Sequence, residues 1–185
     1  SPRGEFGPSS YETVNTYIAE AFKEIGVRKV AWVTDRGDIV IVDVGGSYNP
    51  PMRVGNVKVL LEKPEEVERV EELWKLFTSA WRFYYGKVKI RDGWISPSLL
   101  SAGERKAMTL IYLAKFTDLL IVEAFEGGLH IDMALDLISL LSDEAKYVVL
   151  ETHYGLAIGK ALQHNWNVYY LSEGKAFEVA NLRDV

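Results

Sequence analysis

Residues 118–153 read DLLIVEAFEGGLHIDMALDLISLLSDEAKYVVLETH, and the expected fold follows from the pattern of this segment. Asp118–Val122 and Tyr147–Glu151 are apolar runs of strand length, as buried parallel strands are. Asp132–Leu141, which lies between them, is expected to be a helix. Because a strand, a helix and a second strand in this order form a right-handed crossover unit, we predict that the two strands are parallel neighbours in one sheet.

The alternation of strands and helices continues on both sides of this stretch. Its other expected members are a strand, a loop, a helix, a short helix and a hairpin: Lys87–Arg91, Ser98–Gly103, Glu104–Phe116, Leu156–Gln163, and Asn167–Ser172 with Ala176–Val179. Such an alternation is typical of α/β proteins. We therefore predict an α/β fold in which a parallel sheet is flanked by helices.

The first half of the chain begins with a different pattern. Apolar residues at helical spacing over Val14–Ile25, followed by Gly26 as a C-terminal cap, predict a helix. Arg28–Thr34 and Asp38–Val44 are rich in β-forming residues and predict a hairpin. The fold should therefore carry an N-terminal helix and a β-hairpin in addition to the α/β alternation.

A second helix is expected before the α/β alternation begins. The Gly- and Pro-rich segment Gly45–Pro51 is a break, and Val57–Leu61 is a short candidate strand. Pro64 then opens the helix, and its apolar stripe extends to Tyr84. We interpret the aromatic residues of this stripe as core-facing.

The chain is expected to form one domain over residues 10–185, with a helix–hairpin–helix part at 10–94 and an α/β part at 95–185. Residues 1–9, SPRGEFGPS, are interpreted as a cloning remnant or a flexible leader. A chain of 185 residues, with 48% hydrophobic and 25% charged residues, has a globular composition and can bury a core.

Composition excludes several classes of site. No apolar run approaches the roughly 20 residues that span a bilayer, so no membrane partner is expected. The absence of cysteine excludes disulfides and thiolate metal sites, and makes a cytoplasmic location the default. The net charge of −5 argues against a broadly basic nucleic-acid surface, although a local basic patch or a basic partner is compatible with it.

The loop Leu100–Arg105, with the sequence LSAGER, lies just before a predicted helix. A small Ser-x-Gly loop there exposes unpaired backbone N–H groups at the positive end of the helix dipole, which suits an anion. Ser101 adds a hydroxyl donor. The alternative interpretation is a plain N-cap, in which Ser101 and Glu104 form a capping box.

Two further candidate groups follow the predicted buried strands. Glu123 ends the first strand and precedes the turn Ala124–His130; a carboxylate there can hold Mg²⁺ or orient a water. His153 comes after the second strand, where a neutral imidazole can hydrogen-bond a terminal phosphate. The alternatives are a solvated strand end and a structural histidine, which is how we interpret His164.

Taken together, these segments resemble the C-terminal lobe of ABC-type ATPases. Leu100–Arg105 resembles the signature loop in an LSxGE form, Asp118–His130 resembles the Walker B strand and D-loop of SMC-like and OLD-like ATPases, and Glu151–His153 resembles the H-loop. The resemblance extends over about Ile95–Val179. Each motif alone is short, and the order and spacing of all of them carry the resemblance.

For the signature loop, the resemblance implies nucleotide binding. Ser101 and Gly103 would contact the γ-phosphate of an ATP held by a partner lobe, and Ala102 and Glu104 belong to the same nucleotide-binding loop.

For the later motifs, the resemblance implies catalytic and interface roles. Glu123 would support Mg²⁺ coordination, and His153 would be the switch histidine. Glu126, Gly128 and His130 would lie in the D-loop and face the partner subunit.

Two departures from the family pattern affect the expected activity. Ala124 stands at the position of the catalytic glutamate, so hydrolysis should be slow; it is either an engineered or a natural loss. In an alternative alignment Glu123 is that glutamate and Val122 takes the Walker B position. The chain also has no G-x-x-x-x-G-K-[ST] P-loop, so alone it should bind ATP weakly or not at all.

The implied function is half of an ATP-binding and ATP-hydrolysing head. A P-loop-bearing N-terminal lobe, in the same or a separate chain, would complete it, and composite heads would form a homodimer around ATP and Mg²⁺. DNA repair, chromosome maintenance or defence, with a DNA-associated partner, is the expected setting. A non-catalytic regulatory subunit is the alternative. A Toprim-like metal nuclease, suggested by Ile121–Glu123, lacks the Asp-x-Asp it needs.

Overall fold

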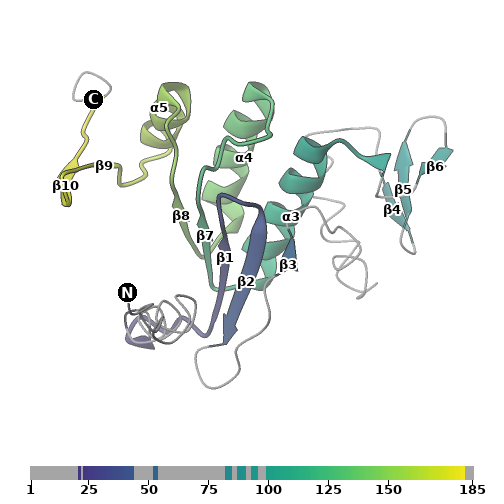
Figure 1. The fold of residues 1–185 in the computed structure, drawn as a ribbon, viewed down its shortest axis with the longest axis horizontal. Coiled ribbons are helices and arrows are strands. Elements are labelled where there is room, and N and C mark those ends of the chain that lie inside the picture. The colour runs from purple at the N-terminus through teal and green to yellow at the C-terminus, as the bar shows by residue number, and fades with distance from the viewer. Residues whose placement is uncertain are drawn as a thin grey trace, which may run out of the picture.

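The computed structural model describes residues 21, 23–43, 52–53, 82–84, 87–90, 93–95 and 99–181. Most of the expected N-terminal helix, the candidate strand Val57–Leu61 and nearly all of the expected helix from Pro64 lie outside these residues. Within the described part the fold is α/β, with a five-stranded sheet, a three-stranded sheet and a two-stranded hairpin (Figure 1).

The five-stranded sheet has the order β3-β2-β1-β7-β8. β1 pairs with β7 in parallel, β7 pairs with β8 in parallel, and β2 is antiparallel to both of its neighbours. The sheet is therefore mixed. Its parallel part, β1, β7 and β8, agrees with the predicted parallel sheet, but the predicted hairpin belongs to the same sheet and adds antiparallel strands to it. The strands are Met52–Arg53 (β3), Asp38–Asp43 (β2), Lys29–Val33 (β1), Leu119–Val122 (β7) and Tyr147–Leu150 (β8).

The central crossover unit is confirmed. β7 and β8 are parallel neighbours, with Leu119 opposite Tyr147 and Val122 opposite Leu150. Helix α4, Ile131–Glu144, connects them and is longer than the predicted Asp132–Leu141. The unit forms because both strands are apolar and short, and because α4 has a continuous apolar face for the sheet.

The N-terminal hairpin is also confirmed, but its position explains why the sheet is mixed. β1 and β2 pair antiparallel about a turn at residues 34–37, where Gly37 has a φ of +82°. The other edge of β1 pairs with β7, so Val30 lies opposite Leu119 and Val33 opposite Val122. The hairpin is therefore part of the five-stranded sheet, and β1 is the central strand of that sheet.

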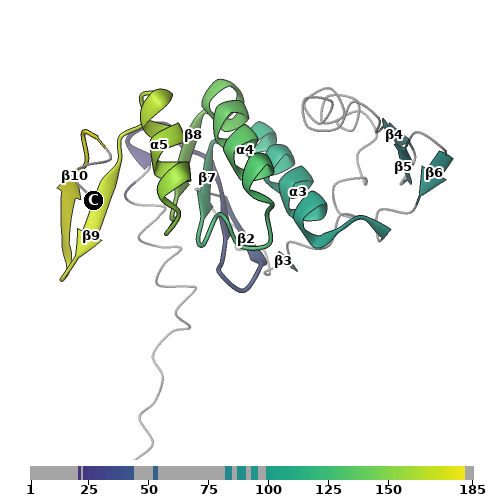
Figure 2. The ribbon, with the colours of Figure 1, turned by 90° about the horizontal axis from the view of Figure 1, so that it is seen from above.

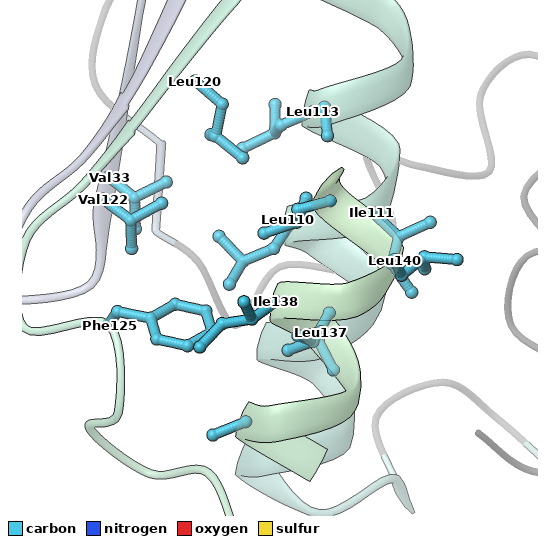
Figure 3. Packing of buried hydrophobic residues seen from close by; sticks show 14 of the residues in the cluster. Val33, Leu110, Ile111, Leu113, Leu120, Val122, Phe125, Leu137, Ile138 and Leu140 are labelled. Atoms are coloured by element: carbon cyan, nitrogen blue, oxygen red, sulfur yellow. The ribbon is translucent and has the colours of Figure 1, made fainter. Parts of the chain in front are cut away.

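The main core lies between one face of the sheet and the helices α3, Ala102–Phe116, α4 and α5, Gly155–Gln163 (Figure 2). Figure 3 shows side chains from α3 and α4 packed against Val33, Leu120 and Val122 of the strands. A smaller cluster occupies the opposite face: Val27, Val30, Val40 and Leu119, with Trp32 and Ile121 packed against it.

The prediction that the second helix extends to Tyr84 is wrong for its last residues. Arg82–Tyr84 forms strand β4, which pairs antiparallel with β5, Lys87–Ile90; β5 in turn pairs with β6, Gly93–Ile95. Aromatic residues such as Phe83 and Tyr84 favour strands, and the available pairing partner decides their conformation over the helical spacing. β5 agrees with the strand predicted at Lys87–Arg91.

The predicted C-terminal hairpin forms with shifted bounds: its strands are β9, Tyr169–Ser172, and β10, Lys175–Glu178, so Lys175 belongs to a strand and not to the turn. Glu173 and Gly174 both have positive φ, as the turn of a two-residue hairpin requires. β9 is not hydrogen-bonded to β8, although α5 leads from one to the other. Large apolar side chains are exposed on the hairpin: Tyr169, Tyr170, Leu171 and Phe177.

Candidate functional site

The predicted motifs meet at the carboxyl ends of β7 and β8. The turn after β7 is held to the end of β8 by the backbone, because Phe125 N–H donates to the carbonyl of Glu151 at 2.9 Å. Phe125 itself is fully buried and lies beside Ile138 in the core (Figure 3). The turn is therefore fixed at both its backbone and its side chain.

Ser101 is the N-cap of α3. Its hydroxyl accepts from the Glu104 N–H at 3.2 Å, and the Glu104 carboxylate accepts from the Ser101 N–H at 2.8 Å. This reciprocal pair is the capping box that the sequence allowed, so the structural interpretation of Ser101 and Glu104 is confirmed. Ser101 and Ala102 are exposed, which leaves this helix end open to an outside ligand. Nucleotide contact by this loop stays a prediction.

Gly103 brings α3 into direct contact with the turn after β7. A Cβ atom at Gly103 would lie 2.5 Å from the carbonyl oxygen of Gly128, closer than any real contact allows. Gly128 itself has a φ of +76°, which glycine adopts without strain. The signature-type loop and the D-loop-type turn are therefore packed backbone to backbone within this chain.

Lys106, one turn further along α3, holds the same turn in place. Its ammonium donates to the carbonyls of Gly127 at 2.7 Å and Ala124 at 3.2 Å. Burial lowers the pKa of Lys106, while the negative charge of Glu126 opposes that change. The lysine thus serves as an internal cation that binds backbone carbonyls of the turn.

Glu126 connects the turn to the segment after β8. One carboxylate oxygen accepts from the Thr152 hydroxyl at 2.7 Å, and the other accepts from the His153 N–H at 3.0 Å. Burial works to raise the pKa of Glu126, but the hydrogen bonds from the His153 backbone, from its own backbone and from Thr152 prevail and lower it. The residue expected at a partner interface is thus also an internal brace of the H-loop-type segment.

Ala124 has a φ of +45°, an uncommon conformation for a residue with a Cβ. Its N–H donates to a carboxylate oxygen of Glu151 at 3.4 Å. The position therefore lacks a carboxylate of its own but lies beside the carboxylate of the neighbouring strand end.

Glu123 is oriented toward the β1–β2 turn. One of its carboxylate oxygens accepts from the Asp35 N–H at 3.0 Å. Protein sites for Mg²⁺ commonly use one or two carboxylates together with water and substrate phosphates. A single strand-end carboxylate such as Glu123 has oxygen atoms of the kind that bind Mg²⁺, and a role of Glu123 in holding the ion stays a prediction.

The histidines occupy different environments. The His153 side chain is 82% exposed, and its Nε2 lies 3.5 Å from the Glu151 carboxylate. His130 is the exposed N-cap residue of α4, and its Nδ1 lies 3.6 Å from a carboxylate oxygen of Asp132. His164 contacts the Ser139 hydroxyl at 3.1 Å, consistent with the structural role expected for it.

Sequence reasoning missed Lys106, Thr152 and the side chain of Glu151. Glu151 could have been found, because it follows an apolar parallel strand as Glu123 does. The expectation that this second strand is buried was wrong, since Tyr147 and Val149 of β8 are exposed at the edge of the sheet, whereas β7 is largely buried. The contacts of Lys106 and Thr152 had no sequence signal, because each depends on how a helix or a strand end packs against the turn at residues 124–128.

Within the described residues, no three His, Cys, Asp or Glu side chains are grouped so that they could hold a metal ion. The helices of that part are all too short or too polar to cross a membrane. Comparison with models of protein families, with curated proteins and with solved structures finds no match for this chain.

Proposed function

We propose that this chain is the C-terminal lobe of an ABC-type ATPase of the SMC-like and OLD-like group, and forms half of an ATP-binding head. The observation that carries the proposal is the physical connection of the three motif segments. Gly103 packs on Gly128, and Glu126 binds Thr152 and His153. In the proposed dimer the signature-type loop acts on the ATP of the second head, and the segments that follow β7 and β8 act on the ATP of their own head. These contacts would hold the two nucleotide sites in a fixed relation to each other.

The lobe that supplies the P-loop is proposed to join at β8. In the part of the chain that the structure describes, β8 ends the sheet and pairs only with β7. Its side chains Tyr147 and Val149 are 42% and 51% exposed. Parallel strands are normally buried, and a bare apolar edge invites pairing. A strand added here would carry its P-loop to the edge of the sheet where His153 lies.

The proposed roles follow from this arrangement. The open end of α3, with Ser101, Ala102, Gly103 and Glu104, contacts the γ-phosphate of ATP bound by the P-loop of a second head. Glu123 holds Mg²⁺, which supplies charge neutralisation for the phosphates. The composite heads form a homodimer around two nucleotides, and the exposed His130 lies at that interface.

We further propose a cytoplasmic location and a task in DNA repair, chromosome maintenance or defence, with a DNA-associated partner. A second candidate function is a non-catalytic regulatory subunit that retains the fold. The observation that favours it is Ala124, which leaves the usual catalytic position without a carboxylate.

The test is nucleotide-driven dimerisation of the assembled head. The chain is co-expressed with its P-loop lobe, and light scattering is measured with and without Mg-ATP. Ser101→Arg should abolish the ATP-dependent increase in mass, because its bulk occupies the place of the partner's γ-phosphate. Asp143→Arg is the matched control, since this exposed residue lies at the opposite end of α4 from His130 and should leave dimerisation intact.

Dimerisation that is unaffected by Ser101→Arg would contradict the proposed trans contact. An assembled head that binds no ATP would contradict the proposed function as a whole.

A further inference from the structure

The backbone of Glu151 makes two hydrogen bonds to β7 and the turn that follows it. Its N–H donates to the Val122 carbonyl at 2.9 Å, and its carbonyl accepts from the Phe125 N–H at 2.9 Å. The backbone of Glu151 is therefore fixed on both sides to the β7 strand and its turn, so its side chain starts from a well-defined point at the carboxyl edge of the sheet.

The Glu151 carboxylate lies between the two positions that matter most for hydrolysis in the proposed head. One oxygen is 3.4 Å from the N–H of Ala124, and the other is 3.5 Å from Nε2 of His153. Both distances are longer than an ordinary N–H···O hydrogen bond, so the carboxylate lies near both groups without being tightly bound to either. The side chain is 54% exposed and accessible to an incoming water.

The neighbouring carboxylates have other partners. Glu126 receives hydrogen bonds from Thr152 and His153, and Glu123 receives one from the Asp35 backbone. Glu151 differs from both, because its contacts are the weakest of the three and point to the position that lacks a carboxylate. It also lies at the end of β8, next to the free edge where the nucleotide-bearing lobe is proposed to join.

We propose that Glu151 is the catalytic carboxylate of this chain and replaces the glutamate missing at position 124; the inference rests on the proposed ATPase function. Glu151 accepts a proton from water as the water oxygen bonds to the γ-phosphorus of ATP. The bond from the γ-phosphorus to the bridging oxygen breaks, and ADP leaves with inorganic phosphate. Glu151 then loses the proton to solvent, to which it is exposed. His153 orients the carboxylate and the terminal phosphate.

The test is Glu151→Gln in the chain assembled with its P-loop lobe, with phosphate release and ATP binding measured in parallel. The amide keeps the shape and one acceptor oxygen for the Ala124 N–H but cannot take a proton. Turnover should fall by roughly 10²–10⁴-fold while the Kd for ATP stays within about threefold, since loss of general-base catalysis is of this size. Glu173→Gln, in the exposed hairpin turn, is the matched control and should leave both unchanged.

A second variant separates a catalytic role from a structural one. Adding Ala124→Glu to Glu151→Gln places a carboxylate at the family position and should restore turnover at least tenfold over Glu151→Gln alone. A residue that only supports the turn would not be rescued in this way.

Each outcome decides a separate point. Full turnover of Glu151→Gln in an active head overturns the role of Glu151 and leaves the ATPase proposal standing. A wild-type head that binds ATP without hydrolysing it overturns both the role of Glu151 and the ATPase activity, and supports the regulatory subunit.

Discussion

Gly103 shows how one residue can serve both a motif and the fold. In the sequence it is the glycine of an anion-binding loop, whereas in the structure it allows α3 to approach the Gly128 carbonyl. The two roles are compatible, since a helix that lies this close to the turn also presents its first N–H groups at the same edge. The glycine is required by packing even if no nucleotide binds.

Substitution of this glycine should therefore destabilise the chain by itself. Gly103→Ala places a methyl group against a backbone oxygen that cannot move freely, and should lower the free energy of unfolding by about 1–3 kcal/mol. Gly155→Ala is the control: it lies in α5, a Cβ there would meet no atom within 4 Å, and the change should be neutral or stabilising by about 0.5–1 kcal/mol. Urea unfolding measures both, and equal stabilities would contradict the close approach.

At the scale of elements, side chains connect the loops. Lys106 joins α3 to the turn after β7, and Glu126 joins that turn to the segment after β8. These contacts span elements that follow one another by 18 to 27 residues in the chain. The candidate site is thus a set of loops that are fixed to one another by side-chain contacts.

The brace at Glu126 should make stability depend on pH. The pKa of Glu126 is lowered in the folded chain. The ionised carboxylate therefore contributes fully to the free energy of unfolding above the ordinary pKa of 4.5, and this contribution is lost as the pH falls through the lowered pKa. At pH 7, Glu126→Gln should cost about 1 kcal/mol of unfolding free energy, because a charged acceptor of two hydrogen bonds is removed. Urea unfolding at several pH values should show this difference shrinking below pH 4.5.

Glu178→Gln, on the exposed strand β10, provides the baseline for that series. The contradicting outcome is a difference in unfolding free energy between the wild type and Glu126→Gln that stays constant down to about pH 3, which is roughly one pH unit or more below the ordinary carboxyl pKa. Such a result would show that the charge of Glu126 contributes nothing to stability.

For the molecule as a whole, the most informative feature is the free edge of the described sheet at β8. The described strands of the sheet end at β8, and the hairpin β9–β10 stands apart from it (Figure 2). Aromatic side chains of the hairpin are exposed. The opposite edge of the described sheet is β3, a strand of 2 residues, so β8 with its 4 residues is the longer free edge. The P-loop lobe that we propose should therefore bind on the side of β8.

Val149→Lys tests this surface. Because Val149 is half exposed, its replacement should change the chain's own stability by no more than about 0.5 kcal/mol. It should nevertheless reduce co-purification of the P-loop lobe at least tenfold, since a lysine on an edge strand opposes pairing. Val149→Thr keeps the β-branched shape and should retain most of the association. Thermal melting of each variant alone serves as the control for folding, and undiminished association of Val149→Lys would place the partner elsewhere.

Periodicity, turn residues and caps were enough to predict the strands and helix of the β7–α4–β8 unit, both hairpins and the capping box at Ser101, because these signals act between residues close in the chain. The parallel pairing of β7 with β8 followed from the crossover rule, although the paired residues are far apart in the chain. The structure was needed to show that β1 pairs with β7, that Gly103 rests on Gly128 and that Glu151 reaches Ala124, which is 27 positions away. No local pattern or connection rule specifies which edges and loops of separate units will meet.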